Sequence, residues 1–183
     1  MTAFGKLMLL ATAFVAVFLQ AALPGLRPWL GVQVDLLPGL MVYAALQTDL
    51  AGVVLLGVAG GLWLDSLSAN PPGTTVLPLL SVGLLLHQRR ELILRDQVFA
   101  QAVLGALAGA LSPVLGLLVL LSLGEEPILG WGALWQLVVL AFSGGVLTPL
   151  WFWWFDRLQH ALAYRRAPTT SFRPDRDIRR GRF

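Results

Sequence analysis

The chain has 183 residues, of which 57% are hydrophobic and only 13% are charged, and its formal net charge is +3. A soluble domain carries about 25% charged residues, so the composition excludes a soluble globular protein and predicts an all-α integral membrane protein. The sequence has no cysteine, which excludes disulfide frameworks, thiolate metal sites and cysteine nucleophiles.

Apolar runs between polar breaks predict six transmembrane helices. We expect them at residues 7–23, 36–47, 50–64, 74–86, 98–123 and 131–155. Together they form one transmembrane domain, residues 1–155, which a basic cytoplasmic tail follows at residues 156–183. The first run is longer than the core of a usual signal peptide, so we expect it to be retained as a span.

Proline and glycine mark residues 24–35 as the first loop, after which Asp35 can cap the second helix, with Pro38 in its first turn. Only three polar residues, 47–49, separate the second and third spans. A single helix from 36 to 64 would be about 44 Å long against a hydrocarbon core of about 30 Å, and it would hold Asp49 inside the membrane. We therefore expect a tight hairpin in which Asp49 caps the third helix.

The stretch GLWLDSLSANPPGTTVLPLL places Asp65 directly after an apolar run and before a proline-rich break. One interpretation is an interfacial residue that bonds to freed amides in the turn of residues 66–70. The other is an inward-facing anchor for a partner helix or for the fold of the loop, because a carboxylate that faces lipid is costly. Beyond the break, Thr74 or Thr75 can cap the fourth helix.

Small residues recur at four-residue spacing in two of the predicted helices, Gly57 with Gly61 and Gly105 with Gly109. Such pairs let helix backbones approach closely, either within the chain or with a partner. In the fifth helix, Pro113 should produce a kink whose freed carbonyls need support from neighbouring helices or from a serine.

The distribution of lysine and arginine predicts the orientation in the membrane. With six spans, one face collects Lys6, Arg89, Arg90, Arg95 and eight arginines of the tail, and the other face has only Arg27. This distribution predicts that both termini lie in the cytoplasm. A five-span arrangement with an external N-terminus satisfies the rule equally well.

Aromatic and basic residues mark the inner interface. Trp151, Trp153 and Trp154 fall at the inner end of the last span, as in an interfacial belt. Basic side chains of the tail are expected to contact anionic lipids, among them Arg165, Arg166, Arg179 and Arg180.

The sequence gives little support to an enzyme. No HExxH, GxSxG or phosphate-cradling GxxxxGK pattern occurs. His87 and His160 are expected at the surface near the inner interface, and the adjacent Glu125 and Glu126 have poor geometry for a pair of catalytic carboxylates. We therefore expect no catalytic residues, no metal, no cofactor and no nucleic-acid partner.

Two stretches, VDLLPGLMVYAAL and GVAGGLWLDSLSANPPGTTVLPLL, resemble the bacterial rod shape-determining protein MreD family. That family has an aspartate-leucine opening to one helix, then a glycine-rich helix ending in Gly-Leu-x-x-Asp, then a Pro-x-Gly turn. Residues 35–37, 61–65 and 72–73 occupy those places. The resemblance is clearest over residues 34–86, and the chain departs from it at Val34, where the family often has proline, and in its arginine-rich tail.

The resemblance implies a non-enzymatic membrane scaffold of the cell-elongation machinery, which regulates cell shape and peptidoglycan synthesis. Such a protein binds the single-span protein MreC and works beside the actin-like MreB, RodA and a penicillin-binding transpeptidase. It also implies a six-helix body similar to the substrate-binding (S) components of energy-coupling-factor transporters. The resemblance also implies a place in the bacterial inner membrane. Together with the glycine spacing, it gives the candidate residues for partner binding or a structural motif, which are Asp35, Gly57, Gly61, Asp65, Pro72 and Gly73.

That similarity supplies an alternative, a vitamin-type binding subunit of a membrane transporter. Those subunits dock through an Ala-x-x-x-Ala motif on the first helix, a spacing that Ala11, Ala13 and Ala16 do not make. The outer half of the chain also offers few convergent polar groups for such a ligand, which disfavours this alternative. The missing motifs likewise disfavour an intramembrane hydrolase.

Overall fold

The computed structural model describes residues 3–22, 31–68, 71–92, 97–124 and 130–164, and all regular secondary structure in these residues is helical. The α-helices are α1 (Ala3–Ala22), α3 (Leu37–Gln47), α4 (Leu50–Leu67), α5 (Val76–Arg89), α6 (Val98–Ser122) and α7 (Trp131–Tyr164), and the 3₁₀ helix η2 (Arg90–Leu92) follows α5. The expectation of an all-α protein is therefore confirmed.

Four of these helices are long and apolar enough to cross a membrane, namely α1, α4, α6 and α7. The other two are apolar but short, with 11 residues in α3 and 14 in α5, which correspond to about 16 Å and about 21 Å. The membrane character of the chain thus rests on the four long helices, with α3 and α5 packed among them.

A two-residue break at Thr48 and Asp49 separates α3 from α4, so the two are distinct helices, as the length argument predicts. Asp49 occupies the N-cap position of α4, but its side chain makes no capping hydrogen bond, and in this respect the prediction is wrong. Instead, Asp49 Oδ2 accepts a hydrogen bond of 2.7 Å from Lys6 Nζ. A cation on the neighbouring α1 is the stronger partner for the carboxylate.

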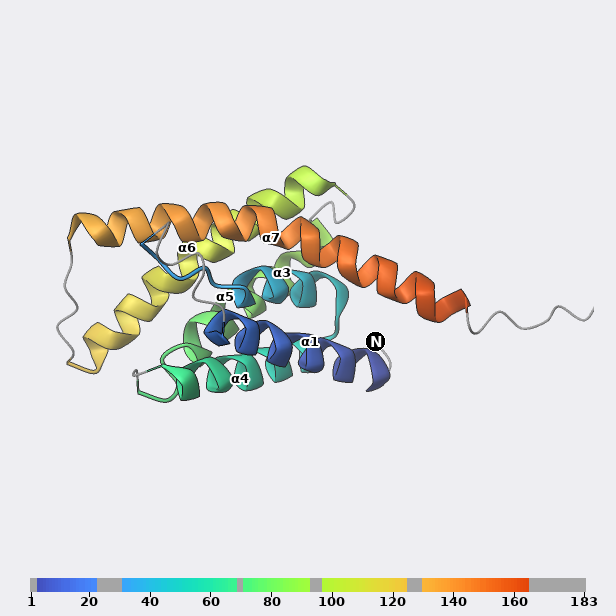
Figure 1. The fold of residues 1–183 in the computed structure, drawn as a ribbon, viewed down its shortest axis with the longest axis horizontal. Helices are drawn as coiled ribbons and strands as arrows, with labels where there is room; N and C mark the ends of the chain where they lie inside the picture. The colour runs from blue at the N-terminus through green and yellow to red at the C-terminus, as the bar shows by residue number, and fades with distance from the viewer. Residues whose placement is uncertain (1–2, 23–30, 69–70, 93–96, 125–129, 165–183) are drawn as a thin grey trace, which may run out of the picture.

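Helix α3 lies at the centre of the bundle, between α7 on one side and α1 and α4 on the other (Figure 1). Every residue from Leu37 to Leu46 is buried. A helix that is apolar on all sides and contacts only protein forms the core of the domain. Its largest side chain, Tyr43, stacks on Phe155 at 4.2 Å between ring centroids and meets Phe152 edge-on at 5.1 Å.

Helices α6 and α7 form an antiparallel pair that crosses the rest of the bundle (Figure 1). The backbones approach most closely where Gly105 and Gly109 of α6 face α7. A Cβ added at Gly105 would lie 2.7 Å from Thr148 Cβ and closer still to the Gly144 carbonyl oxygen, and one added at Gly109 would collide with the Leu140 carbonyl oxygen. This glycine pair therefore serves packing within the chain.

The bundle has two ends of different character. The described lysines and arginines, Lys6, Arg89, Arg90 and Arg157, belong to the end that carries the α3–α4 turn and the last turns of α7, which we call the basic end. At the opposite end, the last turns of α6 and the first turns of α7 extend beyond α1, α4 and α5 (Figure 1).

Helix α7 continues to Tyr164 without a break at the expected boundary after residue 155. Trp153 and Trp154 are exposed, as an interfacial belt requires, and Arg157 lies over the Trp153 ring at 5.7 Å. Trp151 differs from the prediction, because it packs against α3 and its Nε1 donates to the Leu36 carbonyl oxygen at 3.3 Å. Its side chain points from α7 into the bundle rather than toward lipid.

Candidate functional site

Asp65 ties the last turn of α4 to the turn that precedes α5. Its side chain is buried, and Oδ2 accepts the Gly73 N–H at 2.7 Å while Oδ1 accepts the Thr75 N–H at 3.1 Å. The Thr74 hydroxyl donates to Oδ1 at 3.3 Å. Asp65 is thus an inward-facing anchor of the loop, and it accepts hydrogen bonds from backbone N–H groups that follow the proline-rich break.

The local sequence explains this geometry. Gly73 has φ +99°, a backbone conformation that glycine adopts without steric cost, and Pro72 before it is exposed. Neither Thr74 nor Thr75 caps α5 through its own side chain. Because the carboxylate of Asp65 accepts amides at the start of α5, it takes the place of the predicted threonine cap.

The second glycine pair also serves packing within the chain. A Cβ at Gly61 would lie 2.7 Å from the Cα of Val76, the first residue of α5, and one at Gly57 would collide with the Leu80 side chain. Both glycines face α5, so the first turn of that helix lies directly against α4. Gly61 and Asp65 are one turn apart on α4, and together they set the position of the α5 N-terminus.

Asp35 precedes α3 and fixes its first turn. Its Oδ1 accepts the Leu37 N–H at 3.0 Å, but the N-cap residue of α3 is Leu36 rather than Asp35 as expected. The neighbouring Leu36 N–H donates to Gln20 Oε1 at 3.2 Å, and Gln33 Nε2 donates to the Gln20 carbonyl oxygen at 3.1 Å. The last turn of α1 therefore holds the chain that enters α3.

A cavity of about 470 Å³ lies between these two turns and the α6–α7 pair, and we call this end of the bundle the cavity end. Polar side chains from α1, the 31–36 segment, the turn before α5, α6 and α7 line it, among them Gln20, Gln33, Asp35, Thr75, Ser112 and Gln136. The expectation that this half of the chain offers few convergent polar groups is therefore wrong. These residues are far apart in the sequence, and only the fold brings them together.

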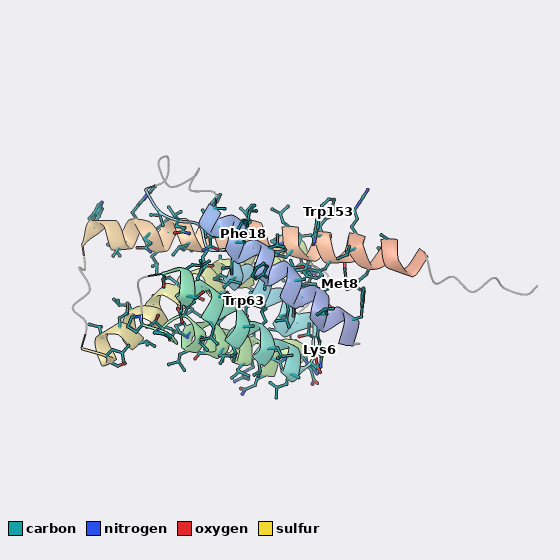
Figure 2. The ribbon with its side chains drawn as sticks, turned by 60° about the horizontal axis from the view of Figure 1, so that its bottom comes forward. Lys6, Met8, Phe18, Trp63 and Trp153 are labelled. Carbon is teal, nitrogen blue, oxygen red and sulfur yellow. The ribbon has the colours of Figure 1, made fainter. Side chains whose placement is uncertain are left out.

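The basic end closes the core with polar contacts to the C-terminus of α3. Arg90 Nη1 donates to the Thr48 carbonyl oxygen at 3.2 Å, and His87 Nδ1 lies 3.0 Å from the Ala45 carbonyl oxygen. The hydrogen bond from Lys6 holds the pKa of Asp49 below its usual value, although desolvation acts in the opposite direction. Figure 2 shows Lys6 and Trp153 at one level along the bundle, and Phe18 and Trp63 nearer the cavity end.

The predicted partner-binding, motif and lipid-contact residues divide into three groups. Asp35 and Asp65 lie at the cavity end, where Gly73 bonds directly to Asp65. Gly57 and Gly61 are covered by α5. The tail arginines Arg165, Arg166, Arg179 and Arg180 lie outside the described residues.

Two residues of the cavity were not predicted as site residues, although the sequence gives a signal for each. Gln20 is an uncharged polar residue near the end of an apolar run, and Ser112 precedes the only proline of α6. Within the described ranges, no group of three or more His, Cys, Asp or Glu side chains could hold a metal ion. The lining can therefore offer hydrogen bonds and apolar contacts to a bound molecule.

Comparison of the chain with protein-family models, with curated proteins and with solved structures gives no match.

Proposed function

We propose that the chain is a six-span, non-enzymatic scaffold of the bacterial cell-elongation complex, which holds an MreC-like single-span protein and regulates peptidoglycan synthesis. The observation that carries the proposal is the convergence of the motif residues at one end of the bundle. Asp65 and Gly73 are joined by a hydrogen bond of 2.7 Å, and Asp35 lines the same cavity as Thr74 and Thr75 of that turn. Asp35, Asp65 and Gly73 thus order the turns at this end of the bundle, and this supports the docking of a partner there.

The short helices are compatible with six crossings. Non-helical chain extends α3 and α5 toward the cavity end, as residues 31–36 and 71–75. Irregular backbone at membrane depth is tolerated where protein covers it or where it lines a cavity. Both segments contribute to the cavity lining, which supports a crossing by each of them.

The charge distribution supports a cytoplasmic basic end. An even number of crossings brings both termini to the same side, and Figure 1 places the start of α1 and the end of α7 toward the same end of the bundle. In this orientation the cavity end and the Asp65 turn face the cell exterior. The basic tail would then lie against anionic lipid of the inner leaflet.

The transport-subunit alternative has less support. Ala13 and Ala16 of α1 are buried in the core and present no docking surface for a second membrane protein. The cavity favours the binding of a small molecule, but a scaffold can also have such a site. The transport role would need a docking surface elsewhere on the chain.

Purification in mild detergent tests the scaffold. We expect a single-span MreC-like protein to co-purify, together with RodA and the transpeptidase in a larger complex. Asp65→Ala should weaken this complex while membrane insertion stays normal, and Ser66→Ala, on the exposed side of the same turn, should leave it intact. Partner binding that is unchanged in Asp65→Ala, or a stoichiometric small ligand in place of a protein, would contradict the proposal.

A further inference from the structure

The cavity has the size and position of a ligand site. Its volume of about 470 Å³ falls within the range of about 300–1,000 Å³ that is usual for sites that enclose small molecules. It is lined by residues from α1, α4, α5, α6 and α7 and from the segment before α3. The cavity therefore depends on the packing of several helices rather than on one local segment.

One wall of the cavity carries a buried hydroxyl that has no hydrogen-bond partner among the described residues. The Ser112 hydroxyl oxygen is buried and has no hydrogen-bond partner. Pro113 has no N–H, so α6 cannot supply the usual donor to the carbonyl of Gly109, which also lines the cavity. A hydroxyl and a carbonyl without their usual partners lie one turn apart, and buried groups of this kind are stabilised by a hydrogen-bonding ligand.

Small residues make this wall accessible. Gly109, Ser112, Pro113 and Gly116 follow the spacing of one helix face and all line the cavity. A Cβ added at Gly116 would have Pro78 Cγ as its nearest neighbour, at 3.9 Å. There is therefore open space in front of this part of α6.

The charge of the lining selects against anions. Among the described residues that line the cavity, Asp35 is the only one with an ionisable side chain, and its Oδ1 already accepts the Leu37 N–H. No described lining residue is a lysine, arginine or histidine, so a bound phosphate or carboxylate would lie near Asp35 without a compensating cation. The remaining lining is largely apolar, with Leu64, Leu67, Pro78, Leu79, Leu120 and Leu140.

We propose that this cavity binds a small uncharged molecule that carries hydroxyl or amide groups at one end and an apolar part at the other. The polar end lies against Ser112 and the Gly109 carbonyl, and the apolar part lies against the leucines. Both a soluble metabolite and the neutral head of a lipid have this chemistry. The inference does not depend on partner binding, because it concerns the chain alone.

Equilibrium dialysis of the purified full chain, without any partner protein, tests the proposal. One arm uses the water-soluble small-molecule extract of the bacterial cells as the probe and the other uses their lipid extract, with mass spectrometry of the retained compounds. We expect one uncharged compound to be enriched, and the arm in which it occurs identifies its source. Enrichment of an anionic compound, or of none, overturns the proposal.

Two variants assign the retained compound to the cavity. Gly116→Leu fills the space in front of α6 and should abolish retention. The matched control Gly132→Leu lies on α7 outside the lining, where an added Cβ meets nothing within 4 Å, and it should retain the compound. Ser112→Ala should weaken binding about three- to tenfold through the loss of one hydrogen bond.

Equal retention by Gly116→Leu and Gly132→Leu would overturn the assignment. If Gly116→Leu does not fold, which its melting curve without ligand reveals, the Ser112→Ala result decides. Unchanged affinity in Ser112→Ala would then refute a polar end against α6.

Discussion

Removal of the Asp65 carboxylate should loosen the connection between α4 and α5 more than any other single change at the cavity end. Asp65 is buried and accepts two backbone N–H groups, from Gly73 at 2.7 Å and from Thr75 at 3.1 Å, as well as the Thr74 hydroxyl at 3.3 Å. Asp65→Ala removes every one of these acceptors. The side chain of alanine supplies no replacement.

The expected loss in the free energy of unfolding of Asp65→Ala follows from these hydrogen bonds. A bond to a charged group contributes about 1.5–3 kcal/mol, and the two amide bonds are the short ones. At the lower end of that range they sum to about 3 kcal/mol, and the longer contact from Thr74 adds little. Asp65→Asn keeps one carbonyl oxygen, so it should retain one amide bond and lose about half as much.

Unfolding of the purified protein in mixed micelles, titrated with a denaturing detergent, measures these differences in the free energy of unfolding. Ser66→Ala is the matched control, because the Ser66 hydroxyl donates to the Trp63 carbonyl oxygen within its own helix and is exposed. The control should change stability by less than about 0.5 kcal/mol. If Asp65→Ala loses no more than Ser66→Ala, the reasoning about the anchor is refuted.

Three further predictions concern the packing and the basic end. Gly105→Ala places a methyl group against the backbone of α7 and should cost about 1–3 kcal/mol, whereas Gly132→Ala should stay within about 0.5 kcal/mol in the same unfolding assay. Lys6→Met should raise the pKa of Asp49 toward its ordinary value of 3.8, as carboxyl ¹³C titration by NMR can measure. Because the contact lowers the pKa in the folded chain, its stabilisation is present above about pH 4 and is lost as the pH falls through the folded value. The Tyr43 hydroxyl accepts a hydrogen bond of 3.2 Å from Gln159 Nε2, so Tyr43→Phe should cost about 0.5–1.5 kcal/mol of unfolding free energy in the same assay.

Local features of the sequence account for what could be predicted of the fold. The break between α3 and α4 follows from helix length and from the cost of a buried Asp49, and the structure has it at Thr48 and Asp49. Asp35 likewise acts at the start of α3, where it accepts the Leu37 N–H, although the N-cap residue is Leu36. Each of these inferences uses residues that are close in the sequence.

The side-chain partners across the fold could not be predicted in the same way. Lys6 and Asp49 are 43 positions apart, and nothing in either neighbourhood indicates the other. Hydropathy also fails to separate α3, which is buried along Leu37–Leu46, from α6, where only a few residues are buried. Lipid and protein interior are similarly apolar, so both helices read as apolar runs.

The cavity could be identified only from the three-dimensional structure. The sequence presents Gln20 as a lone polar residue and Ser112 as part of a kink, and neither pattern indicates that they line one space. Pro113 was expected to need support from a serine, yet the hydroxyl of the adjacent Ser112 makes no hydrogen bond. The unsatisfied group became visible only when its surroundings were known.

The central place of α3 has a consequence for biosynthesis. Helix α7 covers one side of α3, because Gly39 faces Thr148 and Tyr43 packs on Phe152 and Phe155. These α7 residues come more than a hundred positions later in the chain than their partners on α3. Before α7 has been synthesised and inserted, one side of α3 therefore contacts lipid or an insertion factor instead of its final neighbour. A nascent chain that stops after α6 would leave this side of α3 uncovered, so the bundle can close only after α7 has been synthesised.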